Sequence, residues 1–106
     1  MFGNFIIAED NATLEGSILA ELARTNSTLA TAEMYTSGAI SVRLNPPVGD
    51  PDPVLRSVVS RDLKVLSRAV NLTSQEETIS FNAESAERIC NALRTEAAST
   101  YALATL

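Results

Sequence analysis

Residues 28–38 read Thr28-Leu-Ala-Thr-Ala-Glu-Met-Tyr-Thr-Ser-Gly38, a short β-compatible run followed by a turn of small and hydroxylated residues. The run, residues 28–33, lacks a clear polar alternation, which is typical of a strand that helices cover on both faces. Residues 101–106 repeat its Leu-Ala-Thr core, and residues 56–60 form a third run of this kind. The sequence therefore predicts three buried, parallel strands.

Segments with helical patterns alternate with these runs. The first helix is predicted over residues 11–25, where apolar side chains recur at every fourth position, at Leu14, Ile18 and Leu22. Either Asp10 or Asn11 can cap it. Thr36 can cap a second helix, which must end before Pro46 because proline cannot continue the helical hydrogen bonding.

Two more helices are predicted in the second half of the chain. Residues 63–70 form a short one, and Asn82 can cap the clearest of the four. Its apolar face consists of Ala86, Ile89, Cys90, Leu93 and Ala97. This alternation predicts right-handed crossovers and a mainly parallel sheet in a three-layer α/β sandwich. The 106 residues fit one domain, residues 1–106, in which residues 1–10 form an N-terminal arm.

Composition excludes several classes of function. The net charge of −5 gives no basis for binding nucleic acid. No apolar run approaches the roughly 20 residues of a membrane span, and the first ten residues do not resemble a secretory signal, so we expect a cytoplasmic protein without membrane contact. The chain has no histidine and one cysteine, which excludes Ser-His-Asp and Cys-His catalysis. We expect neither a metal site nor a cofactor.

The turn after residues 28–33 is the predicted site, because ligands of parallel α/β sheets bind beyond the carboxyl ends of the strands. Glu33, Thr36, Ser37 and Gly38 are the candidate ligand-binding residues. Two hydroxyls and the free amides of a helix N-terminus would suit an anion or an oxyanion. The alternative is that Thr36 only caps the helix.

The same stretch carries a resemblance to a known family. Leu29-Ala-Thr-Ala-Glu-Met-Tyr-Thr-Ser-Gly38 resembles the signature Leu-Ala-Thr-Ala-Glu-Ser-Cys-Thr-Gly-Gly of the C-terminal domain of the CinA family, which includes nicotinamide mononucleotide amidases. Seven of the ten residues are identical. The similarity continues through Lys64-Val-Leu-Ser-Arg-Ala-Val70 and into the last strand, Tyr101-Ala-Leu-Ala104. It implies a truncated, CinA-like α/β domain and a ligand similar to a pyridine nucleotide.

The chain departs from the family pattern at the positions that the resemblance assigns to catalysis. The resemblance implies a serine nucleophile where this chain has Met34, and a tyrosine where it has Arg61, so that only Lys64 remains. The sequence also stops at Leu106, before the nucleotide loop of the family. We therefore expect a protein that binds a ligand or a partner without amidase activity.

Two alternatives stay open. In the first, the chain is an active amidase that releases ammonia from nicotinamide mononucleotide, with Ser37, or less favourably Thr36, as the nucleophile and Lys64 as its base. In the second, it is a vestigial fragment without a selected function. We also expect a homodimer, because a parallel sheet that ends with residues 101–106 would leave an open edge and an uncovered apolar face. Residues 2–8 could cross to the partner.

Overall fold

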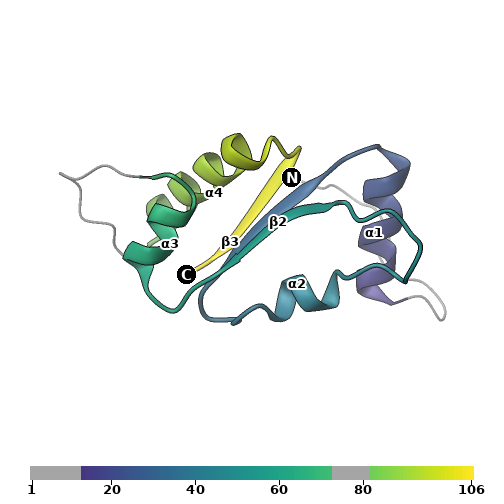
Figure 1. Cartoon of the computed structure of the whole chain (residues 1–106), viewed down its shortest axis with the longest axis horizontal. Helices are drawn as coiled ribbons and strands as arrows, with labels where there is room; N and C mark the ends of the chain where they lie inside the picture. Colours follow the sequence, from purple (N-terminus) through teal and green to yellow (C-terminus); the bar gives the residue numbers. More distant parts are fainter. Residues whose placement is uncertain (1–12, 73–81) are drawn as a thin grey trace.

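The computed structural model describes residues 13–72 and 82–106 and shows an α/β fold with an entirely parallel sheet (Figure 1). The strands are β1 (Leu29–Glu33), β2 (Val54–Val59) and β3 (Tyr101–Thr105), in the order β2-β1-β3. Both neighbours of β1 run parallel to it. The predicted fold class and the three predicted strands are thus confirmed, although β2 begins at Val54, before the predicted residue 56.

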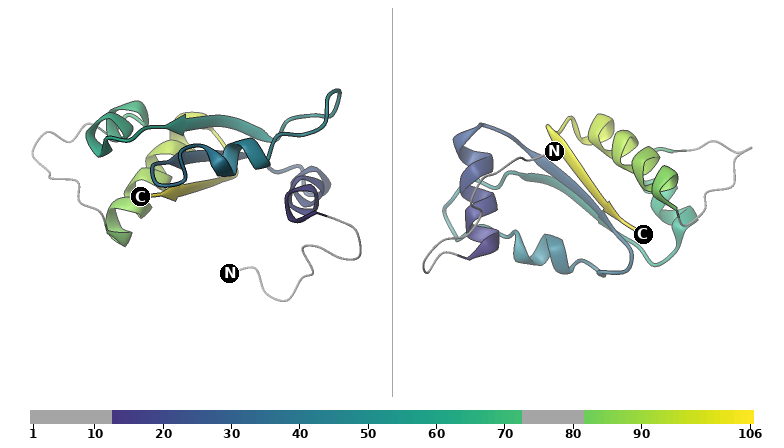
Figure 2. Two further views of the ribbon diagram at one scale, coloured as in Figure 1. Left: turned by 90° about the horizontal axis from the view of Figure 1, so that it is seen from below. Right: turned by 180° about the vertical axis from the view of Figure 1, so that it is seen from behind.

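Four helices accompany the sheet within the described residues: α1 (Leu14–Arg24), α2 (Ala39–Arg43), α3 (Leu63–Ala69) and α4 (Ala83–Ala97). In both views of Figure 2, α1 lies at the opposite end of the molecule from α3. None of these helices combines the length and the apolar character needed to cross a bilayer.

The predicted N-terminal caps are right for α4 and wrong for α1. The Asn82 side chain accepts a hydrogen bond from the Ser85 amide at 2.8 Å, so the predicted cap of α4 is confirmed. The predicted start of α1 is wrong, because the helix begins at Leu14 and its cap is Thr13, which accepts from the Gly16 amide at 3.0 Å. Asp10 and Asn11 lie outside the described residues.

One face of the sheet packs against α3 and α4. Ala30 and Ala32 of β1 point to this side and are fully buried. They belong to an apolar cluster with Met34, Leu63, Leu66, Val70, Ile89 and Leu93. Small side chains on the central strand allow α4 to lie close to the sheet. Cys90 borders this region, and burial raises the pKa of its thiol, as expected for an unreactive packing residue.

The other face of the sheet carries α2. Because side chains alternate along a strand, Thr31 and Glu33 point away from the apolar cluster and towards this helix. α2 has only five residues, and its N-cap is Gly38 in the left-handed region, with φ 90°. The prediction that Thr36 caps α2 is therefore wrong; the Thr36 hydroxyl donates to the Glu33 carboxylate instead.

Candidate functional site

The candidate site is the turn between β1 and α2, where the carboxyl ends of the three strands meet. The Met34 amide donates to the carbonyl oxygen of Thr105 at 2.9 Å, and the Ser60 amide donates to that of Glu33 at 3.1 Å. The turn is therefore joined to both neighbouring strands by backbone hydrogen bonds. This is the edge at which parallel α/β sheets bind their ligands.

Glu33 is the central polar group of the turn, and its side chain has no exposed surface. The carboxylate accepts hydrogen bonds from the hydroxyls of Thr36 and Ser41, both at 2.5 Å. It also accepts from the amides of Ile40 at 2.9 Å and Ser41 at 3.0 Å. Glu33 thus satisfies the amides at the start of α2 that a capping side chain would otherwise satisfy.

These contacts explain the ionisation of Glu33. Burial by itself would raise the pKa of the carboxyl group, because it removes water from the charged form. The hydrogen bonds from Ser41, Thr36 and the two amides outweigh burial and hold the pKa of Glu33 below its ordinary value. The side chain is therefore a buried carboxylate whose charge is stabilised by the turn and by α2.

The Glu33 carboxylate is part of a longer hydrogen-bonded chain of side chains. On one side, the Ser41 hydroxyl lies 2.8 Å from that of Thr31, which donates to Ser57 of β2 at 3.0 Å. On the other side, the Thr36 hydroxyl lies 3.0 Å from that of Thr105 in β3. We call this chain the polar network: Ser57, Thr31, Ser41, Glu33, Thr36 and Thr105. It connects all three strands to α2 and to the turn.

The other two candidates of the turn differ from each other. Gly38 is buried, and a Cβ atom there would lie 3.3 Å from the Val59 side chain. Its positive φ and this close approach together require glycine. Ser37 is exposed and also has a positive φ, 51°. Its hydroxyl donates to the Met34 carbonyl oxygen at 3.5 Å, and because Ser37 is exposed whereas Thr36 is half-buried, Ser37 carries the more accessible hydroxyl of the predicted site.

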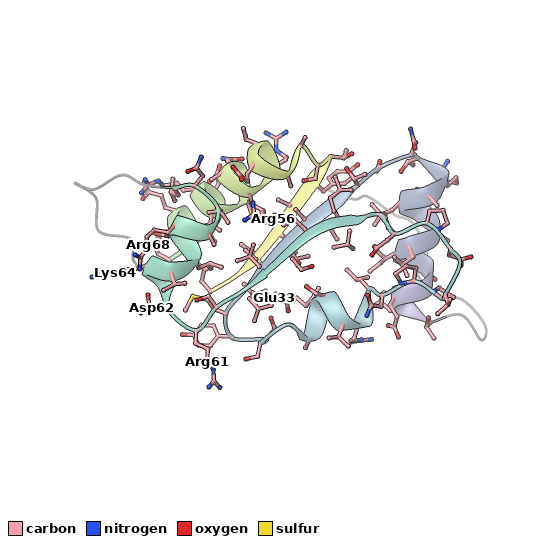
Figure 3. The ribbon with its side chains drawn as sticks, viewed as in Figure 1. Glu33, Arg56, Arg61, Asp62, Lys64 and Arg68 are labelled. Carbon is pink, nitrogen blue, oxygen red and sulfur yellow. The ribbon has the colours of Figure 1, made fainter. Side chains whose placement is uncertain are left out.

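The residues of the amidase alternative, Ser37 or Thr36 with Lys64, lie on different elements: the two hydroxyls are in the turn after β1, and the lysine is on α3. Met34 is only 8% exposed and packs in the apolar cluster. Lys64 lies on the exposed side of α3, and Figure 3 shows both Lys64 and Arg61 pointing outward and away from Glu33. Across residues 13–72 and 82–106, no hydrogen bond joins the Ser37 hydroxyl to the Lys64 amine. The structure therefore does not form the pair that the amidase alternative requires.

A hollow of about 340 Å³ opens beside the turn. It lies between the end of β1, the end of the chain and the first turn of α4, and it is lined by Tyr35, Asn82, Ala83, Ala86 and Leu106. The Tyr35 ring is 75% exposed. A larger hollow, about 580 Å³, lies between the end of α3 and α4, away from this turn, so we associate the smaller one with the site.

Sequence reasoning missed the contribution of α4 to this hollow. Asn82 and Ala86 are distant from Tyr35 in the sequence, and they meet it only through the order of the strands. The sequence signal that could have indicated this contribution is the predicted cap at Asn82. It marks the start of a helix, and that start lies at the carboxyl end of the sheet. Within the described segments, no three Asp, Glu or Cys side chains gather closely enough to hold a metal ion.

The fold and the site together define a class. The chain has a parallel α/β sheet in the order β2-β1-β3, with a strand–turn–helix site after its central strand. Figure 1 shows the turn at the same end of the sheet as the end of β3. The chain accordingly belongs to the parallel α/β class, in which ligand sites generally lie beside the carboxyl ends of the strands.

Comparison with known proteins shows which proteins this chain is similar to. The chain is 33% identical over 94 residues to a CinA-like protein of Prochlorococcus marinus strain MIT 9312, and 32% identical over 92 residues to one from strain MIT 9215. The matches cover 89% and 87% of this chain, but only 22% and 21% of the two relatives. No protein-family model matches the chain. The chain is therefore a distant relative of CinA-like proteins, as predicted, and spans about a fifth of their length.

Proposed function

We propose that this chain is a CinA-like domain that binds a small ligand, similar to a pyridine nucleotide, without amidase activity. The observation that carries the proposal is the burial of Met34 in the apolar cluster, at the position where the resemblance implies a serine nucleophile. A thioether cannot act as the nucleophile of an amidase. The protein is proposed to work in the cytoplasm, in keeping with its single cysteine.

The polar network supports the absence of catalysis. The Glu33 carboxylate is fully buried and accepts hydrogen bonds from neighbouring groups, so it is not oriented to remove a proton from Ser37 or from water. Lys64 is exposed on α3. An accessible serine without a base within hydrogen-bond reach keeps the low nucleophilicity of an ordinary hydroxyl.

Ligand binding is supported by the hollow beside Tyr35. An exposed tyrosine ring offers a flat surface on which an aromatic base or a pyridine ring can stack. The network fixes the backbone of the turn next to this ring, because Glu33 and Thr36 both form hydrogen bonds within it. The geometry thus favours a preformed binding surface over a catalytic one.

The test combines an activity assay with a binding assay on the purified chain. Incubation with nicotinamide mononucleotide should release no ammonia above the buffer rate. Titration of the same ligand, followed by nuclear magnetic resonance, should shift the signals of Tyr35 and of the first turn of α4. Tyr35→Ala should abolish these shifts. Tyr101→Ala is the matched control, because Tyr101 is an exposed tyrosine on β3 outside the hollow, and it should leave them unchanged.

Two results would overturn the proposal. Ammonia release that Ser37→Ala or Lys64→Ala abolishes would establish the amidase alternative. Absence of any shift at millimolar ligand, or equal shifts in the two tyrosine variants, would remove the binding surface. Met34→Ser alone should not create activity, because the resemblance implies a tyrosine where this chain has Arg61.

A further inference from the structure

Two walls of the hollow beside the turn come from distant parts of the chain. Tyr35 follows β1, whereas Leu106 follows β3. The Met34 amide donates to the Thr105 carbonyl oxygen at 2.9 Å, and the hydroxyls of Thr36 and Thr105 lie 3.0 Å apart. Both sequence neighbours of Tyr35 are thus bonded to the residue that precedes Leu106.

The side chain of Thr105 belongs to the polar network, whereas that of Leu106 packs on the opposite side of the sheet. The strand register places Thr105 beside Glu33, and its hydroxyl contacts Thr36 there. Side chains alternate along a strand, and Leu106 accordingly packs against the apolar cluster. A hydrogen bond of the Thr105 side chain therefore restrains the backbone next to Leu106, which lines the hollow.

The direction of the hydrogen bond between the two threonines follows from their hydrogens. A hydroxyl has one hydrogen, and Thr36 donates its hydrogen to the Glu33 carboxylate. Thr36 can then only accept from Thr105, so Thr105 is the donor. Donation to a carboxylate polarises the Thr36 hydroxyl and makes it a better acceptor. A side chain of the same shape without a hydroxyl hydrogen therefore cannot replace Thr105 in this contact.

We propose that Thr105 is a positioning residue of this hollow, because its hydroxyl, by donating to the turn, holds Tyr35 and Leu106 at the separation that the ligand requires. The inference rests on the proposed function, since this role exists only if a ligand binds between the two walls. Thr105 acts through Thr36 and Leu106 rather than by touching the ligand. Preorganisation of this kind raises affinity, because fewer groups must be ordered when the ligand binds.

The pairing of β1 with β3 has other supports besides this hydrogen bond. The backbone of β3 pairs with β1 along the whole of Tyr101–Thr105. At the other end of the sheet, the Thr28 amide donates to the Thr100 hydroxyl at 3.0 Å, and the Thr100 amide donates to the Thr28 hydroxyl at 2.9 Å. Loss of the Thr105 hydroxyl should therefore loosen the turn while the two strands stay paired.

Fluorine nuclear magnetic resonance of the full chain, labelled with fluorotyrosine, tests this role. The chain has two tyrosines, Tyr35 and Tyr101, so the variant Tyr101→Phe assigns their signals. Nicotinamide mononucleotide should shift the Tyr35 signal of the wild type. Thr105→Val should raise the dissociation constant about fivefold, the effect of one lost hydrogen bond. It should also displace the Tyr35 signal before any ligand is added.

Two control variants separate positioning from general stability. Thr105→Ser keeps the donor and should bind the ligand with the affinity of the wild type. Thr100→Val removes the corresponding hydroxyl at the far end of the sheet, and it should leave both the affinity and the Tyr35 signal unchanged. Thr105→Ala is a second test variant in case valine prevents folding, and it should weaken binding as Thr105→Val does.

The outcomes distinguish this inference from the proposed function. Absence of a ligand shift in the wild type would overturn the proposed function and, with it, the role of Thr105. Equal dissociation constants for the wild type and Thr105→Val would overturn the role of Thr105 alone. Equal losses of affinity in Thr105→Val and Thr105→Ser, or in Thr105→Val and Thr100→Val, would also overturn it, because the loss would then not depend on this hydroxyl.

Discussion

The two faces of β1 are buried by different physical means. On one face, Ala30 and Ala32 pack into an apolar cluster, where stabilisation depends on buried area and on filled volume. On the other face, Thr31 and Glu33 belong to the polar network, where stabilisation depends on hydrogen-bond partners and on the geometry of the hydrogen bonds. Consecutive residues of one strand are thus stabilised by different interactions. The effect of a substitution depends on the face to which the side chain points.

The largest difference between the faces is expected at Glu33. Glu33→Ala removes four accepted hydrogen bonds and leaves two amides and two half-buried hydroxyls without their acceptor. The expected loss in the free energy of unfolding is about 4 kcal/mol, a large part of the roughly 5 to 15 kcal/mol by which a domain is ordinarily stable. Urea denaturation followed by circular dichroism measures it. Glu84→Ala, an exposed glutamate in the first turn of α4, should cost less than about 1 kcal/mol.

The apolar face should respond to lost volume. Leu93 is fully buried in the apolar cluster, so Leu93→Ala should lower the free energy of unfolding by about 3 kcal/mol through lost burial and a residual cavity. The same truncation at Leu14 of α1, which is 45% exposed, should cost much less. Denaturation curves that gave equal losses for the two variants would contradict the assignment of the core.

A shape-conserving exchange separates the two faces more finely. Thr31→Val keeps the volume of the side chain but removes the hydroxyl that contacts both Ser41 and Ser57. It should cost about 1 to 2 kcal/mol, because those two hydroxyls lose a buried partner. An unchanged or increased melting temperature would show that burial alone decides stability on this face as well.

The smallest expected effect is the pH dependence that Glu33 contributes. Since hydrogen bonds hold its pKa below the ordinary value of 4.5, folding favours its charged form. Its contribution is then present above about pH 4.5 and is lost as the pH falls through the lower pKa of the folded state. Glu33→Gln should therefore be less stable than the wild type at neutral pH, and the difference should shrink in acid. A difference that stayed constant from neutral to acid pH would show that the carboxylate is not charged in the folded protein.

The strands and the α4 cap could be predicted because their signals are local. Residues 28–33 and 101–106 share a Leu-Ala-Thr core, and Asn82 precedes a clear apolar periodicity. The cap of α2 could not be predicted in this way. Glu33 lies in a strand, seven residues before Ile40, and reaches the helix only because the turn folds back over β1. A capping rule looks for a polar side chain just before the expected helix start, and it selected Thr36, whereas the helix begins at Ala39.

The candidate site shows the same limit. Its position at the end of β1 followed from the alternation of helices and strands, and the structure has the turn there. The directions of its side chains did not follow, because they depend on the partners that the register supplies. Thr36 points inward to Glu33 and Thr105, whereas Ser37, the next residue, is exposed. Nothing in the stretch Thr36-Ser37 distinguishes an internal hydroxyl from an accessible one.

The hydrogen bond between Thr36 and Thr105 also has a kinetic consequence. Its two residues are 69 positions apart, and the paired threonines Thr28 and Thr100 at the other end of the sheet are separated by 72. Contacts of such separation close large loops and slow the search for the native state. Until β3 arrives, β1 has only β2 as a neighbour and the polar network lacks its last member. During synthesis, the central strand therefore cannot gain its second neighbour before residues 101–105 have been made.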